Sequence, residues 1–399
     1  MRFPGFEGDW EVKKLGEIAK FSKGKGISKI DVVEDGATEC IRYGELYTHY
    51  GETVDEIKSK TNIDKSSLVL SEANDVIIPA SGETQIDIAT ASCVLKSGVA
   101  LGGDLNIIKT SNNGVFLSYY LNSSKKMEIA RLSQGISVVH LYSSQLALLN
   151  LKLPILSEQN KIATFLSLLN ERITTQKKII KNLESLIQSF REKIFSRKLR
   201  FRNKESNVFP NWERMKLKNL ATRLTDKNTA NNKNVLTISA QYGLISQLDF
   251  FNKSVSAKNV TGYYLLDKND FAYNKSYSNG YPMGAIKKLI NYEKGVVSTL
   301  YICFRFHSNV NSDYMKHYFD SGFQNVEIEK IAQEGARNHG LLNIGINDFF
   351  NIEIYLPSIE EKGIISNFLS KIENKIGTEK KILAQYKSQK NYLLSNLFI

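Results

Sequence analysis

A long repeated segment constrains this chain more than any other feature of its sequence. The segment from Leu153 to Arg200 returns in the last 44 residues at a constant offset of 203, and the two copies align without a gap. The Leu153-Pro154 pair, for example, returns as Leu356-Pro357. The duplication divides the chain into two halves, each of which is expected to contain the same element.

Each copy of the repeat carries apolar residues at alternating steps of four and three. This spacing is the heptad pattern of a long helix that wraps another helix. We call these positions the seam. Its members are Ile162, Leu166, Leu169, Ile173, Ile180, Leu183, Ile187, Phe190 and Ile194 in the first copy, and Ile365, Leu369, Ile372, Ile376, Leu383, Tyr386, Leu393 and Leu397 in the second.

Polar residues interrupt the seam at one matching place, and the second copy has one further polar residue. Gln176 and Glu379 occupy the same position of the two copies, and Lys390 stands where the first copy has Ile187. Because a polar residue in an apolar seam lowers stability but fixes register, we interpret Gln176 and Glu379 as register markers for two helices that pair with each other. The alternative is two separate amphipathic helices that lie on different cores.

The two halves also begin alike. Phe3-Pro4 precedes Trp10-Glu11, and Phe209-Pro210 precedes Trp212-Glu213. Less similar residues then lead to the Leu-Pro pair of each repeat. The sequence therefore predicts four segments: a first globule at residues 1–152, a long helix at 153–202, a second globule at 203–355 and a second long helix at 356–399.

The two globules are expected to share a plan although their sequences differ. Each is predicted to contain a strand after a turn aspartate (75–79 and 270–274), a strand after a glycine (98–101 and 295–298), a helix (115–132 and 313–332) and a last strand that leads into the repeat (149–153 and 352–356). The predicted fold class is mixed α/β, with two globular domains separated by two long coiled-coil helices in a pseudo-two-fold cyclic repeat. Such an axis requires the helices to run antiparallel, with one globule at each end of the pair.

Composition narrows the functional classes. The 399 residues include 42% hydrophobic ones, and the formal net charge is +12, which is expected for a protein that binds nucleic acid or an anionic membrane. The sequence has no apolar run of about 18 residues and no amino-terminal signal, so we favour nucleic acid and expect a cytoplasmic protein. The three cysteines, Cys40, Cys93 and Cys303, lie far apart and are interpreted as core thiols.

The sequence lacks the signatures of several enzyme classes. It has no GxxxxGK[ST] phosphate loop and no Asn- or Asp-Pro-Pro-aromatic stretch, because its six prolines are never adjacent. The cluster Gly24-Lys25-Gly26 lacks the third glycine of a dinucleotide-binding loop. The five histidines show no metal-ligand spacing and are interpreted as ordinary core or surface residues. We therefore predict no catalytic residues and no metal site.

Basic, amide and aromatic side chains gather in segments that resemble loops. Lys and Arg neutralise phosphates, whereas Asn, Gln and Arg read base edges. The alternative is that these segments are solvated loops whose aromatic residues pack on the core. The candidate DNA-binding residues are Lys23, Lys25, Arg42 and Tyr43 in the first globule, and Gln241, Tyr242, Asn274, Lys275, Ser276, Tyr277, Arg337 and Asn338 in the second.

The whole chain resembles the specificity subunit of type I restriction-modification systems. The resemblance rests on the duplicated LPxxxEQxxIxxFL-type helix start at 153–166 and 356–369, on the two opening segments, and on the two dissimilar globules. The stretches 235–251 and 270–284 also resemble target-recognition domains of that family. The second copy has Glu361-Lys362-Gly363 where the first has Glu158-Gln159-Asn160, which argues against identical partner contacts at the two helix starts.

The resemblance implies a DNA-recognition subunit without catalytic activity. Each globule would read one half of an asymmetric bipartite site in double-stranded DNA, and the helix pair would set the spacer between the halves. Two modification subunits would supply S-adenosylmethionine-dependent adenine methylation, and two restriction subunits would supply ATP- and Mg²⁺-dependent translocation and cleavage. Because the helical repeats are alike, we expect the modification subunits to dock on their outward face, at Thr164, Leu168, Asn367 and Lys371.

Two other functions remain open at this stage. A stand-alone DNA-modifying enzyme would need the missing catalytic motifs. A scaffold built on a coiled coil would need no basic globules, and a salt titration of DNA binding separates it from a DNA-binding protein, since phosphate contacts weaken steeply as salt rises.

We predict that the purified chain transfers no methyl group to DNA, because no cofactor-binding or catalytic motif is present. Incubation with labelled S-adenosylmethionine and DNA measures this directly. Incorporation of label by the pure chain would contradict the prediction.

Overall fold

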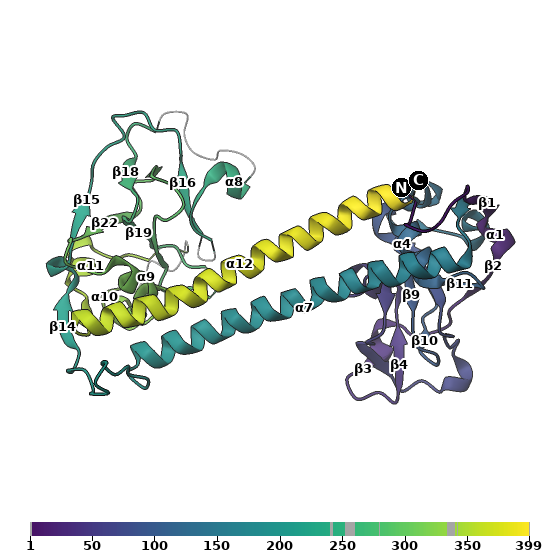
Figure 1. Ribbon diagram of the computed structural model, residues 1–399, viewed down its shortest axis with the longest axis horizontal. Coiled ribbons are helices and arrows are strands. Elements are labelled where there is room, and N and C mark those ends of the chain that lie inside the picture. The colour runs from purple at the N-terminus through teal and green to yellow at the C-terminus, as the bar shows by residue number, and fades with distance from the viewer. Residues whose placement is uncertain are drawn as a thin grey trace. The chain divides into compact units, whose positions relative to one another are not determined.

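The computed structural model describes residues 2–239, 242–251, 260–278, 280–332, 340 and 342–398. The chain forms two compact units (Figure 1). Unit 1 comprises Met1–Lys177 and Lys381–Ile399, and unit 2 comprises Lys178–Lys380. Each unit contains one globule, by which we mean its part outside the two long helices, and one part of each long helix. Among the described residues, no helix combines the length and the apolar character needed to cross a membrane.

The two long helices are the elements that the seam predicts. Helix α7 spans Leu156–Phe195 and helix α12 spans Ile359–Leu397. In unit 1, Ile162 and Leu166 of α7 lie in the same apolar cluster as Leu397 of α12. In unit 2, Ile187 of α7 lies in the same cluster as Ile365 of α12. The start of one helix thus packs near the end of the other in each unit, which confirms the antiparallel direction.

The polar seam positions are buried like their apolar neighbours. Gln176 and Glu379 are each 7% exposed. The Glu379 carboxylate lies 2.6 Å from the Lys375 ammonium one turn earlier in α12. Their role in fixing register stays a prediction.

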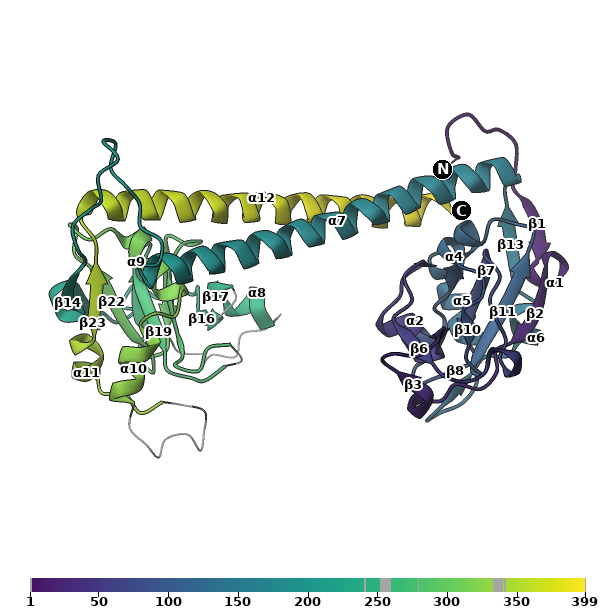
Figure 2. The same cartoon turned by 90° about the horizontal axis from the view of Figure 1, so that it is seen from below.

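The globule of unit 1 contains one five-stranded and one four-stranded sheet, beside the strand pairs β1-β13 (Glu11–Lys14 with Asn150–Leu153) and β12-β8 (Val139–His140 with Ser81–Gly82). The larger has the strand order β2-β11-β7-β9-β5, formed by Ala19–Lys23, Leu105–Thr110, Asp75–Pro79, Ser92–Val94 and Thr53–Val54. The smaller has the order β10-β4-β6-β3, formed by Ala100–Leu101, Thr38–Ile41, Ser59–Thr61 and Val32–Val33. Helix α4 (Gly114–Asn122) packs on the larger sheet (Figure 2). The remaining α-helices of the globule are α1 (Leu15–Ile18), α2 (Tyr43–Thr48), α3 (Gln85–Ile88), α5 (Lys126–Leu132) and α6 (Ser143–Leu146).

The globule of unit 2 is built around one four-stranded antiparallel sheet. Its order is β15-β22-β19-β20, formed by Ala221–Leu224, Ile302–Phe306, Phe271–Asn274 and Ala285–Lys288. Two antiparallel ribbons accompany it, β16 (Leu236–Ser239) with β17 (Gly243–Ser246), and β18 (Tyr264–Asp267) with β21 (Lys294–Val297). The remaining elements are β14 (Glu213–Lys216), α8 (Gln247–Phe251), α9 (Ser312–Asp320), α10 (Asn325–Ile331), α11 (Ile346–Asn351) and β23 (Glu353–Leu356). The mixed α/β fold class is confirmed.

A pair of terminal strands closes each globule in the same way. In unit 1, β1 runs antiparallel to β13, and in unit 2, β14 runs antiparallel to β23. The strands predicted at 149–153 and 352–356 therefore exist. Each joins the beginning of its globule to the start of the following long helix.

The single helices predicted at 115–132 and 313–332 are wrong, because each stretch forms two helices. The side chains of Asn113 and Asn311 cap α4 and α9 at their starts. Both helices then end at a serine whose hydroxyl bonds back to a helical carbonyl, Ser123 to Tyr119 at 2.7 Å and Ser321 to Tyr318 at 2.5 Å. A side-chain bond of this kind competes with the helical ladder, so an apolar periodicity that continues past the serine does not imply one continuous helix.

The opening segments of the two units match differently from the way the sequence indicates. The tryptophans correspond as expected, but the phenylalanines do not. Trp10 and Trp212 correspond, since they pack on Phe116 and Tyr314 with ring centroids 6.0 and 6.3 Å apart. Phe3, however, packs on Phe165 as Phe201 packs on Phe368, at 6.0 and 5.5 Å. The contact partner of Phe3 in the repeat is thus Phe201 rather than Phe209. A longer turn in unit 2, closed by the bridge between Arg202 and Val208, separates the phenylalanine from the tryptophan.

A phenylalanine at the end of α7, and one directly after the end of α12, lie inside the globules. Phe398 stacks on Tyr120 at 5.2 Å, and its centroid lies 5.5 Å from that of Phe116. Phe195, its equivalent in the repeat, lies 5.4 Å from Tyr318 and 5.6 Å from Tyr314. Both phenylalanine side chains are almost completely buried.

We expect Phe398→Ala to lower the free energy of unfolding of unit 1 by about 3 to 5 kcal/mol, because it leaves an aromatic-sized cavity. The two tryptophans lie in different units, so Trp10 fluorescence in a Trp212→Phe background reports urea unfolding of unit 1. The matched control is Tyr392→Ala, which removes a 63% exposed ring from the same helix. An equal effect of the two variants would show that the buried ring contributes no more to the free energy of unfolding than the exposed one.

Candidate nucleic-acid interface

The loop that carries Lys23 and Lys25 is fixed by its backbone. Strand β2 ends at Lys23, after which the Gly24 amide donates to the Leu105 carbonyl at 3.0 Å and the Lys25 amide donates to the Leu101 carbonyl at 2.9 Å. A Cβ atom on Gly24 would lie 2.0 Å from the Gly102 carbonyl oxygen. The glycine is thus required for close approach of two backbones, and both lysine side chains remain exposed.

The Arg42-Tyr43 cluster adjoins this loop. The Gly102 amide donates to the Ile41 carbonyl, and the Gly103 amide donates to the Gly26 carbonyl, both at 2.9 Å. The segment 101–103 therefore contacts both candidate clusters, and the structure brings the Lys25 and Arg42 segments together. Tyr43 packs against an apolar cluster, so its ring has the anchoring role that we considered as the alternative.

The sequence analysis did not single out three exposed residues of this globule, one of which contacts Lys23. The Lys23 ammonium lies 5.9 Å from the ring centroid of Tyr142, and that ring stacks on His140 at 6.4 Å. A short turn closed by Gln134 and His140 carries Ile136 fully exposed at its tip. Gly135 has φ +124°, and a Cβ there would lie 2.1 Å from the Val138 carbonyl oxygen. The loop glycine was the available signal, but exposure of Ile136 and Tyr142 follows only from the fold.

The candidate segment Asn274–Tyr277 of unit 2 begins at the last residue of β19. The Asn274 side-chain oxygen accepts from the Ser276 amide at 3.0 Å, and the Lys275 carbonyl accepts from the Leu342 amide at 3.0 Å. The Tyr277 amide donates to the Gly340 carbonyl at 2.7 Å, leaving the Tyr277 ring 63% exposed. Gln241, Arg337 and Asn338 lie outside the described residues.

Tyr242 belongs to a separate aromatic group. It is 64% exposed, and its ring packs on Phe250 at 6.3 Å, which in turn packs on Phe251 at 4.7 Å. Its contacts run to α8, whereas those of Asn274–Tyr277 run to Gly340 and Leu342. The described candidates of unit 2 thus make two separate sets of contacts.

The four candidate partner-binding residues all face outward. Thr164 and Leu168 are exposed on α7, and Asn367 and Lys371 are exposed on α12. Thr164 and Leu168 line a shallow hollow of about 650 Å³ together with Phe3 and Phe165. In unit 2, the equivalent Phe368 is covered by Phe190 at 5.0 Å and by Phe201. The two helix starts therefore present different surfaces.

The glutamate of each helix-start motif is buried and paired with an arginine. Glu361 accepts from Arg200 Nε at 2.7 Å and Nη2 at 2.9 Å, and from Trp212 Nε1 at 3.1 Å. Glu158 lies 3.1 Å from Arg2 Nη2. Both carboxylates are fully buried. This part of the motif holds the opening segment against the helix start and does not form a surface for a partner.

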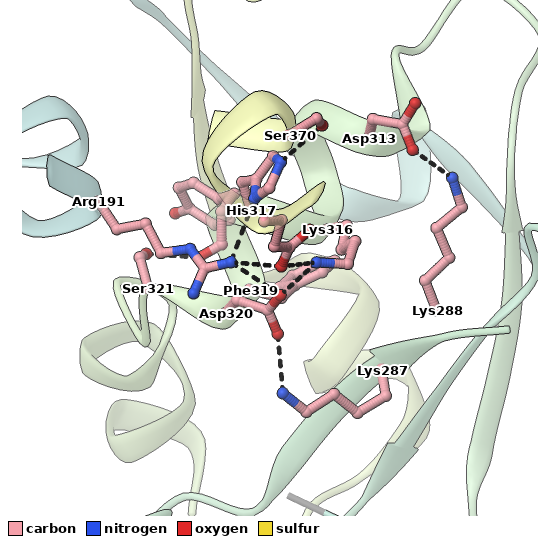
Figure 3. A network of polar contacts seen from close by, with 12 residues as sticks. Arg191, Lys287, Lys288, Asp313, Lys316, His317, Phe319, Asp320, Ser321 and Ser370 are labelled. Atoms are coloured by element: carbon pink, nitrogen blue, oxygen red, sulfur yellow. Dashed lines mark hydrogen bonds and ion pairs between the residues drawn. The ribbon is translucent and has the colours of Figure 1, made fainter. Parts of the chain in front are cut away.

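A network of charged residues joins α9 to both long helices in unit 2 (Figure 3). Arg191 Nη2 donates to Glu373 at 2.8 Å and to Asp320 at 3.4 Å, and Lys316 donates to Asp320 at 2.9 Å. Lys287 of β20 donates to the other Asp320 oxygen at 2.8 Å. Burial alone would raise the pKa of Asp320, but the Lys316, Lys287 and Arg191 cations outweigh it and hold that pKa far below its usual range.

His317 lies inside this network. It is completely buried, with Nε2 3.0 Å from Ser370 Oγ and Nδ1 3.3 Å from Arg191 Nη2. Donor atoms of His317, Asp320 and Glu373 lie within 4.8 Å of one another, as metal ligands would. However, Arg191, Lys316 and Lys287 already occupy the carboxylate oxygens, so a divalent cation would have to displace three ammonium or guanidinium groups. The arrangement fits an ion-pair network better than a metal centre.

The three cysteines are buried free thiols, which confirms their interpretation as core residues. Burial raises the pKa of Cys93 and Cys303 to about 12 and that of Cys40 to about 11. A thiol with so high a pKa carries little thiolate at neutral pH and is a poor nucleophile.

Comparison with known proteins agrees with this picture. Residues 7–185 match the family model described as type I restriction modification DNA specificity domain. The S subunit of a type I restriction-modification system from M. genitalium shares the fold at a TM-score of 0.61 and 14% identity, over 98% of this chain and 96% of that one. A chain from a structure on complex assembly and conformational transition of the type I R-M system gives 0.52 and 14%, over 98% of both chains.

The chain thus shares the fold of a solved type I S subunit. The family match covers fewer than half of the 399 residues, so it shows a likeness of residues 7–185 to that specificity domain. The resemblance that the duplicated helix starts suggested is therefore confirmed.

We expect unit 2 to lose stability as pH falls from 6.5 to 4.5. Burial and the nearby Lys316 ammonium lower the pKa of His317 to about 4, below the value of about 6.5 in an unfolded chain. Between these values the unfolded state binds the extra proton, so the free energy of unfolding falls with pH, by about 2 to 3 kcal/mol for this group. His317→Gln should flatten the dependence in urea unfolding followed by Trp212 fluorescence.

The matched control is His307→Gln, which changes an exposed histidine of the same unit and should preserve the wild-type dependence. A wild-type slope in the His317→Gln variant would contradict the assignment.

Proposed function

We propose that each globule binds one half of an asymmetric bipartite DNA site, as the specificity subunit of a type I restriction-modification enzyme. One observation carries the proposal. The globules of the two units have different sheets, but they pack on the long helices and opening segments through equivalent aromatic contacts. Phe195 and Phe398 enter the two globules in the same manner, and so do Trp10 and Trp212. The sheets that these contacts support differ in strand number and order. Recognition of two different half-sites requires two globules that have different surfaces but are attached to the helices in the same way.

The chemistry of the exposed loops supports DNA as the ligand. In unit 1, Lys23 and Lys25 are exposed beside the half-buried Arg42, so cationic groups are available for phosphates. In unit 2, Asn274, Lys275, Ser276 and Tyr277 combine amide, cationic and aromatic groups on one restrained segment. Amide side chains pair with adenine edges, and arginine pairs with guanine. Tyr242, Gln241, Arg337 and Asn338 complete the proposed contact set.

We propose that two modification subunits dock on the long helices. Thr164 and Leu168 on α7 correspond in the repeat to Asn367 and Lys371 on α12, and all four are exposed. The positions are equivalent in the repeat although their side chains and surroundings differ, so each helix start would dock one copy of the partner through its own contacts. The modification subunits would bring S-adenosylmethionine, and two restriction subunits would bring ATP and Mg²⁺.

We propose that the long helices set the spacer between the half-sites. The 40 residues of α7 correspond to about 60 Å at 1.5 Å per residue. One turn of DNA is about 34 Å. A helix of this length is therefore sufficient to define the number of unspecified base pairs between two major-groove segments.

The decisive experiment exchanges one globule. Replacing residues 20–140 by the equivalent part of another specificity subunit should change one half-site and leave the other intact, because the unit 2 loops are untouched. Sequencing of methylated adenines in a host that carries the hybrid with its modification subunit reads both halves. The matched control exchanges the unit 2 globule, which should change only the other half. A change in both halves after either exchange would refute independent recognition.

A further inference from the structure

Equivalent positions between the globule and the long helices carry different polar or charged side chains in the two units. Tyr119 and His317 occupy the same place in α4 and α9, because Asn113 and Asn311 cap these helices alike. The repeat offset places Asn170 of α7 where α12 has Glu373. The geometry of the interface is thus repeated, while its polar groups are not.

In unit 1 the interface holds one carboxylate and one ammonium group. Lys390 of α12 donates to Glu52 of the globule at 2.7 Å and to Asn170 at 2.8 Å. The Asn170 amide donates to the second Glu52 oxygen at 3.1 Å and to Tyr119 at 2.7 Å. The side chains of Glu52 and Lys390 are only 15% and 17% exposed. Lys390 occupies the seam position where α7 has Ile187.

In unit 2 the charges are distributed differently. The globule contributes Lys316, Lys287 and Asp320, whereas the helices contribute Arg191 and Glu373. Arg191 occupies the place that Leu394 takes in unit 1. The helix carboxylate of unit 2 thus replaces an amide, and its arginine replaces an apolar residue.

Exchanging the globules would leave buried charges without partners. On the helix ends of unit 2, Glu52 would meet Glu373 in the place of Asn170 and Ile187 in the place of Lys390. On the helix ends of unit 1, Lys316 would lose Glu373 and Asp320 would lose Arg191, because Asn170 and Leu394 occupy those places. A buried charge left without its partner is strongly destabilising.

We propose that these buried charges determine which globule each pair of helix ends accepts, so that the two globules are not interchangeable between the two positions of the chain. The matching groups are Asn170 and Lys390 for the globule that carries Glu52, and Arg191 and Glu373 for the globule that carries Lys316 and Asp320. This interface selects its partner segment by charge complementarity. The proposal concerns folding and stands whether or not the globules bind DNA.

The first test places the unit 2 globule in both positions. One full-length chimera keeps the natural helix ends of unit 1, and a second carries Asn170→Glu, Lys390→Ile and Leu394→Arg, which reproduce the helix ends of unit 2. We expect the matched chimera to be the more soluble and to melt about 10 °C higher than the unmatched one. Equal melting temperatures would overturn the proposal.

The second test uses the natural chain and decides the matter if neither chimera folds. Glu52→Lys and Lys390→Glu should each lower the melting temperature of unit 1, followed by Trp10 fluorescence in the Trp212→Phe background. The double variant restores the ion pair with reversed polarity and should recover at least half of the loss. Lys387→Glu, on an exposed position of the same helix, should not rescue Glu52→Lys. The proposal would be overturned if the double variant lost as much melting temperature as the two single variants together.

Discussion

Burial of the seam by the globules is the constraint on which the rest of the structure depends. In unit 1, Ile162, Leu166 and Leu397 of the long helices share one apolar cluster with Phe116 and Tyr120 of the globule. A long helix in water gains little stability from its own hydrogen bonds and needs such packing. The globule in turn lacks part of its core without the helix ends. For this reason the compact units cut across both long helices instead of separating helices from globules.

The polar groups at the same interface give selectivity more than stability. Desolvating Glu52 and Lys390, or Asp320 and Lys316, offsets much of the attraction between them. An apolar interface of the same shape would be as stable but would accept either globule. The two units therefore combine a shared apolar contact, through Phe195 and Phe398, with unlike ion pairs. The apolar contact packs a globule on the helix ends, and the ion pairs determine which of the two globules fits there.

This frame leaves the exposed loops free to differ. The Lys25 and Arg42 segments are fixed to each other through backbone hydrogen bonds with residues 101–103, and the Asn274–Tyr277 segment is fixed through Gly340 and Leu342. Their side chains can therefore vary without affecting the packing of the helices. In the proposed function, the net charge of +12 would supply attraction to DNA, while restrained polar side chains would supply discrimination between bases. The residues proposed for recognition are thus different from those that pack the globules on the helices.

The sequence alone determined the repeat, the seam, the antiparallel direction of the helices and the mixed α/β class, because these follow from periodicity and duplication, which are local properties of the chain. It also indicated loops that the fold leaves exposed, such as those with Lys25 and Tyr277. It did not reveal that α4 and α5 are separate helices, since a serine hydroxyl bond ends α4 without interrupting the apolar pattern. Nor did it show that Phe3 corresponds to Phe201. That match is defined by the rings that the two side chains contact in the long helices, and sequence spacing does not indicate it.

Only the tertiary structure decided which groups the buried charges contact. Lys390 breaks the apolar seam and finds its carboxylate in Glu52, 338 residues away in the sequence. His317 lies among charges drawn from α7, α9, α12 and β20. Periodicity reports which residues face inward, but the partner of a buried charge depends on which distant segments the fold brings within hydrogen-bonding distance of it.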